Sequence, residues 1–169
     1  MNTPLGAYLD ELKINKSRLS NITGITTDRI NALSHEATAI PYTDEVFPII
    51  YVANYLSGIP EDKFNSTIDR IYPRKTKNLL INKLKGQSPA AQLFGNYTFQ
   101  RKDVEIETNI PAGKISKYMN DKNKKAPIEE IIRFIDSIGL DLLETLKKYY
   151  GVIDVNQRLK EFEEKLHRG

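Results

Sequence analysis

Side chains able to form directional hydrogen bonds gather in the short segment 26–34. Thr26, Thr27, Arg29 and Asn31 surround the apolar Ile30, so on a helix they would point away from the buried face. Arginine matches the paired acceptors of guanine, asparagine matches adenine, and threonine methyls contact thymine. The segment therefore predicts contacts with DNA base edges. The alternative is that Arg29 and Asn31 are ordinary solvated helix residues.

A second set of side chains has the charge needed for phosphate contact. Lysine and arginine hold the nucleic-acid backbone without reading its sequence. The lysines at 122–125 can equally form a plain solvated loop, and those of 74–85 can cover a helix with their apolar stems. The candidates for backbone contact are Lys16, Arg18, Arg74, Lys75, Lys77, Arg101, Lys114, Lys117, Lys122, Lys124 and Lys125.

Composition narrows the classes of function. The chain has no cysteine, which excludes disulfides and thiolate metal sites and favours a reducing cytoplasm. His35 and His167 lack ligand spacing, and the sequence has no nucleophile–base pair or glycine-rich phosphate loop. We therefore expect no metal, no cofactor and no enzymatic activity. The longest apolar-rich stretch, residues 46–56, is too short to cross a bilayer, so no membrane association is expected.

Charge is distributed unevenly along the chain. The net charge is +3, yet residues 61–87 carry 7 basic and 3 acidic side chains, and residues 88–125 carry 7 and 4. The middle of the chain is therefore positive, where it can meet phosphate.

Helical periodicity dominates the sequence and predicts no strand of any length. Gly24 is placed to end one helix in the left-handed region, and Thr26 is a suitable N-cap for the next. Two short helices joined by a tight turn would then present segment 26–34 on the second helix. Val155, Leu159, Phe162 and Leu166 form a two-heptad apolar seam near the C-terminus. That seam predicts either an intrachain packing helix or a homodimer contact.

The helical pattern is repeated later in the chain. NITGITTDRINALSHE at 21–36 aligns with IETNIPAGKISKYMND at 106–121 with a constant offset of 85, placing Ile25 on Ile110 and Ile30 on Ile115. Asn109 takes the place of Gly24, and asparagine is the next-best residue for a left-handed cap. We interpret the pattern as an internal duplication of a helical unit.

Residues 5–57 resemble the helix-turn-helix of the lambda-repressor or Cro type, the Xre family, and residues 90–150 resemble it more weakly. The resemblance depends on Leu19, Ser20, Gly24, Ile25 and Ile30. It implies DNA binding through the second of the two helices. The chain departs from the family where glutamine often opens the first of them, since Lys16 and Arg101 stand there. Glu105 also replaces the small residue corresponding to Ser20.

The expected fold is all-α, with two tandem four- or five-helix lambda-repressor-like units and a C-terminal helix. The predicted domains are a first unit, a partly helical basic linker, a second unit and an amphipathic C-terminal helix, at 1–72, 73–89, 90–151 and 152–169.

The leading functional hypothesis is sequence-specific binding of double-stranded DNA by a bacterial or phage transcriptional regulator. The first unit would read bases and the second would grip the backbone. Two units could also bind two half-sites, or one unit could hold a partner. The alternative is a helical protein-interaction module that keeps the fold without DNA readout. The sequence identifies no small-molecule effector.

Overall fold

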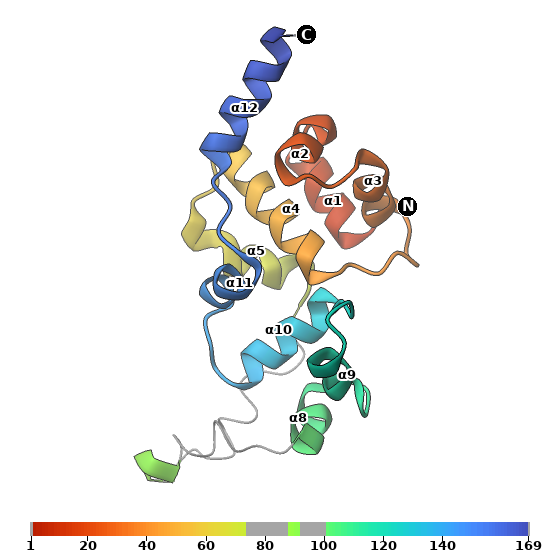
Figure 1. Ribbon diagram of the computed structural model, residues 1–169, viewed down its shortest axis with the longest axis vertical. Coiled ribbons are helices and arrows are strands. Elements are labelled where there is room, and N and C mark those ends of the chain that lie inside the picture. Colours follow the sequence, from red (N-terminus) through yellow and green to blue (C-terminus); the bar gives the residue numbers. More distant parts are fainter. Residues whose placement is uncertain (1, 74–87, 92–100, 169) are drawn as a thin grey trace. The chain divides into compact units, whose positions relative to one another are not determined.

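The computed structural model describes residues 2–73, 88–91 and 101–168 (Figure 1). Every regular element within these residues is a helix, which confirms the all-α prediction. The chain divides into two compact units, Met1–Pro73 with Leu146–Gly169, and Arg74–Thr145. Most of the predicted basic linker, including Arg74, Lys75 and Lys77, lies outside the described residues.

The first unit begins with five α-helices and a short 3-10 helix. They are α1 (Pro4–Glu11), α2 (Lys16–Thr23), α3 (Thr27–His35), α4 (Thr43–Leu56), η1 (Glu61–Lys63) and α5 (Phe64–Ile71). The division between the units falls within α11 (Leu142–Tyr150), and α12 (Val155–Arg168) closes the first unit.

Local sequence explains where the first three helices begin. The side chains of Thr3, Asn15 and Thr26 each accept a hydrogen bond from the backbone N–H three residues later, at 3.1, 3.0 and 3.2 Å. Each bond satisfies one of the N–H groups that a helix leaves without an internal partner. Gly24 ends α2 with φ at 78°, the left-handed conformation that glycine adopts without strain.

The core of the first unit lies between α4 and the helices around it. Leu9, Leu19, Ile30 and Ile50 are almost completely buried. Helix α1 approaches α3 closely at Gly6, where an added Cβ would lie 2.0 Å from the Ser34 carbonyl oxygen. This packing fixes α3 with its opposite face free of the core.

The C-terminal segment 146–168 packs onto the same unit. Helix α12 lies beside α2, and Arg158 Nη1 donates to the Ile22 carbonyl at 2.8 Å, near the C-terminal end of α2 (Figure 1). The Tyr55 hydroxyl also bonds to the Asn156 side chain. Val155 is buried while Leu166, at the other end of the seam, is exposed.

The second unit contains α8 (Arg101–Thr108), α9 (Lys114–Asn120) and α10 (Ile128–Ser137), with α8 packed on α10. Helix α8 begins and ends 85 residues after α2, and α10 begins 85 residues after α4.

Hydrogen bonds and backbone angles repeat at the same interval. Thr23 and Thr108 each donate to the carbonyl four residues earlier, at 2.8 and 2.6 Å. Asn109, like Gly24, is left-handed, with φ at 57°. These correspondences support the interpretation of an internal repeat.

Candidate nucleic-acid interface

The outer face of α3 carries most of the side chains predicted to contact bases. Thr26, Thr27 and Asn31 are exposed, while Ile30 on the opposite face is fully buried. Asp28 is also exposed in the first turn, where a carboxylate favours the positive end of the helix. The α2–α3 turn therefore presents a polar helix face to solvent.

A chain of hydrogen bonds links this face to the start of α2. Lys16 Nζ donates to Asn31 Oδ1 at 3.0 Å and lies 3.2 Å from His35 Nε2. Because an ammonium group only donates, Nε2 acts as the acceptor and the proton of the ring is assigned to Nδ1. That nitrogen lies 2.8 Å from Asn2 Oδ1, whose amide nitrogen donates to Asp10 at 2.5 Å. The structure thus joins a predicted phosphate contact, Lys16, to a predicted base contact, Asn31.

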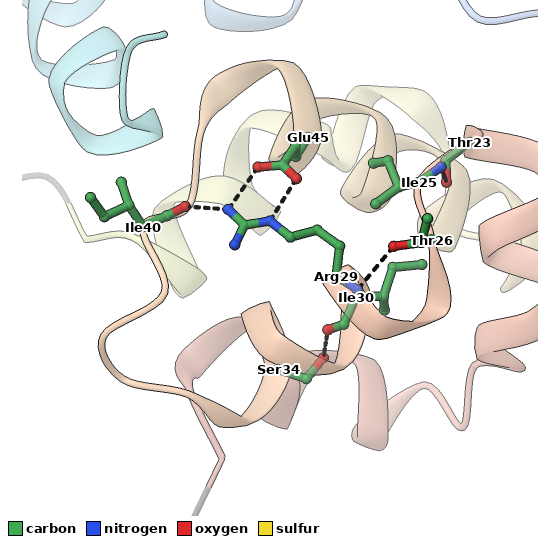
Figure 2. A network of polar contacts seen from close by, with 8 residues as sticks. All are labelled: Thr23, Ile25, Thr26, Arg29, Ile30, Ser34, Ile40 and Glu45. Atoms are coloured by element: carbon green, nitrogen blue, oxygen red, sulfur yellow. Dashed lines mark hydrogen bonds and ion pairs between the residues drawn. The ribbon is translucent and has the colours of Figure 1, made fainter.

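Arg29 is held within the chain. Figure 2 shows its guanidinium between the Glu45 carboxylate and the Ile40 carbonyl oxygen. Arg29 donates to Glu45 at 2.7 Å and 2.9 Å, and to Ile40 at 2.8 Å. The hydrogen bond from Glu45 is the largest cause of the raised pKa of Arg29. The side chain therefore joins α3 to the first turn of α4 and to the loop between them, and base contact by Arg29 stays a prediction that requires these bonds to open.

The second unit contains the same ion pair at the repeat interval. Lys114 and Glu130 lie 85 residues after Arg29 and Glu45, and Lys114 Nζ donates to Glu130 Oε2 at 2.6 Å. The Tyr118 hydroxyl donates to the other carboxylate oxygen at 3.0 Å. Burial lowers the pKa of Lys114, but the hydrogen bonds to Glu130 and Tyr118 outweigh it and the net pKa is raised.

The start of α9 differs from the start of α3. Glu105 Oε1 accepts a hydrogen bond from the Gly113 N–H at 2.8 Å, so a carboxylate lies where α3 has the neutral hydroxyl of Thr26. Glu105 therefore has a capping role that explains an acidic residue at a position expected to be small.

The remaining predicted backbone contacts are dispersed. Arg18 is half-buried on α2, while Lys117, Lys122, Lys124 and Lys125 are exposed on α9 and the following loop. Arg101 opens α8, and its side chain lies outside the described residues.

Two contributions were missed by the sequence analysis. It considered His35 only as a metal ligand, although His35 helps to hold Lys16. It also gave Glu45 no role. The signal that could have identified Glu45 is the basic–acidic spacing of 16 residues, which recurs in Lys114 and Glu130.

Comparison with known proteins gives no neighbour. The chain matches no family model, no curated protein and no solved structure. Within the described residues, no helix has the length and apolar character to cross a membrane. The same part of the chain contains no group of three or more histidines or carboxylates arranged to hold a metal ion.

Proposed function

We propose that the first unit binds double-stranded DNA sequence-specifically, with α3 as the recognition helix of a bacterial or phage transcriptional regulator. The observation that carries the proposal is the contact between Lys16 and Asn31 on an exposed polar helix face. One residue has the charge for phosphate and the other has the amide for a base edge.

Charge at the start of α2 supports the proposal. Lys16 and Arg18 lie in its first turn, which contains no acidic residue. Cations are unfavourable at the positive end of a helix, and a bound phosphate would relieve this repulsion. We therefore assign these two side chains to the DNA backbone.

Asn31 is the side chain best placed to read sequence. Lys16 occupies one lone pair of Asn31 Oδ1, and the amide nitrogen has no partner among the described residues. A second lone pair and two N–H donors remain, as paired contact with adenine requires. Thr26 and Thr27 flank it at the N-terminal end of α3. Arg29 in our proposal keeps α3 and α4 together.

The second unit has two candidate roles. Exposed Lys117, Lys122 and Lys124 suit the backbone grip suggested by the sequence. Two observations favour the alternative of a protein-interaction module, namely the engagement of Lys114 by Glu130 and the carboxylate of Glu105 at the start of α9. A carboxylate at that helix end repels phosphate.

The test is selection of duplexes from a random pool by the full chain at several salt concentrations, followed by sequencing. We expect a defined motif and an affinity that falls steeply with salt. Asn31→Ala should lose about 10- to 150-fold discrimination at one base pair, whereas the control Asn21→Ala, on exposed α2 surface, should retain it. The half-site spacing would show whether one unit, two units or a homodimer through α12 binds. Failure to retain any duplex at low salt would refute the proposal and favour the protein-interaction module.

A further inference from the structure

A cavity of about 290 Å³ lies beside the C-terminal half of α4. Its walls include the rings of Tyr51, Tyr55 and Phe64, and its rim carries the carboxylate of Glu61 and the ring of Pro60. Phe64 is buried, whereas Glu61 is 49% exposed. The cavity therefore combines apolar aromatic walls with an accessible negative charge.

The chain places its own ammonium group at this rim. Lys147 forms an ion pair with Glu61, and its Nζ lies 5.9 Å from the centre of the Tyr51 ring. The Lys147 side chain is only 20% exposed. A carboxylate and the face of an aromatic ring are two groups that attract an ammonium ion, and partial desolvation strengthens the second attraction.

We propose that this cavity is a binding site for an organic ammonium ligand, which replaces the ammonium of Lys147 and places an apolar body among the aromatic rings. Lys147 reaches the site from α11, so its position is limited by the helix that carries it. A free ligand can satisfy Glu61 and Tyr51 and also fill the volume beyond them. It thereby gains apolar contacts that the tethered lysine does not make.

The test is chemical rescue of Lys147→Ala with 2-phenylethylammonium chloride, followed by thermal unfolding. Lys148→Ala is the matched control, because the Lys148 ammonium lies over Tyr149, 5.4 Å from its ring centre. At concentrations about tenfold above the dissociation constant, the probe should raise the unfolding midpoint of Lys147→Ala by about 3–8 °C. The same concentration should move the midpoint of Lys148→Ala by less than half of that shift. Equal shifts in the two variants would overturn the proposal.

Two further comparisons separate charge from apolar contact. Neutral 2-phenylethanol should produce little of the rescue, and Glu61→Gln introduced into Lys147→Ala should reduce the affinity for the ammonium probe at least fivefold. If 2-phenylethanol rescues as well as the ammonium, the proposal is wrong.

A direct measurement covers the case in which Lys147→Ala does not fold. Ring-proton shifts of Tyr51, Tyr55 and Phe64 in the unsubstituted chain should then respond to the ammonium and not to equal sodium chloride, and the absence of a selective response would refute the site. These measurements contain no DNA, so their outcome is independent of the proposed DNA binding.

Discussion

The ion pair between Arg29 and Glu45 is expected to stabilise the first unit as well as to position α3. The perturbation is a double-mutant cycle of Arg29→Met, Glu45→Gln and the double variant. Methionine keeps much of the apolar stem of Arg29, and glutamine keeps the shape of Glu45. The cycle therefore isolates the charged contact more cleanly than alanine substitutions.

The magnitude follows from the geometry. Arg29 makes two charge-assisted hydrogen bonds to Glu45, and the two side chains are 31% and 14% exposed. Exposed ion pairs contribute about 0.2–1 kcal/mol, and hydrogen bonds to charged groups contribute about 1.5–3 kcal/mol. A partly buried bidentate pair should fall between these ranges, so we expect a coupling energy of about 1–1.5 kcal/mol. Arg29→Met alone should cost about 2 kcal/mol, since the Ile40 carbonyl also loses its donor.

The assay is urea unfolding of all four chains, followed by far-ultraviolet circular dichroism. The ion pair of Arg70 with Glu11 serves as a control, because its side chains are 61% and 51% exposed. Its coupling should be below about 0.5 kcal/mol. A coupling no larger at Arg29 and Glu45 than at this control would refute our account of the bridge.

The same variant tests the assignment of roles on α3. If Arg29 positions the helix, Arg29→Met should weaken binding to all duplexes by a similar factor. Selective loss of preference at one base pair would instead show that the guanidinium leaves Glu45 and reads DNA.

Three further predictions concern the framework that presents α3. Gly24→Ala should destabilise the first unit by about 1 kcal/mol in urea unfolding, because φ is 78° and, among the described residues, no atom lies within 4 Å of the added Cβ. Gly6→Ala should cost about 1–3 kcal/mol by the same measurement, since the new methyl group meets the Ser34 carbonyl. Burial is the largest cause of the raised pKa of Tyr8. Its contribution to stability is present below pH of about 10 and is lost as pH rises through the raised pKa, so unfolding free energy should fall on alkaline titration, and less so in Tyr8→Phe.

Some of the candidate site was predictable because it depends on neighbours in sequence. Gly24 and Thr26 set the turn and the start of α3 through their own backbone and side-chain chemistry. The exposed face of Thr26, Thr27 and Asn31 follows from the helical period once Ile30 is assigned to the core.

Other features depend on contacts that local pattern does not specify. The predicted division at residue 152 treats the C-terminal helix separately, whereas the compact first unit includes the chain from Leu146 onward. Apolar spacing shows that α12 has a face to bury. It does not show that Arg158 will meet the Ile22 carbonyl, 136 residues away in sequence.

The sequence by itself therefore determined the helices, their caps and the polar character of α3, because each depends on interactions within a few residues. Tertiary structure decided which charged groups are free to act. Arg29 and Asn31 are similar candidates by residue type, but folding brings Glu45 to the first and Lys16 to the second. Charge pairing depends on distance in space, and a guanidinium held by a carboxylate has a different role from an amide presented at the surface.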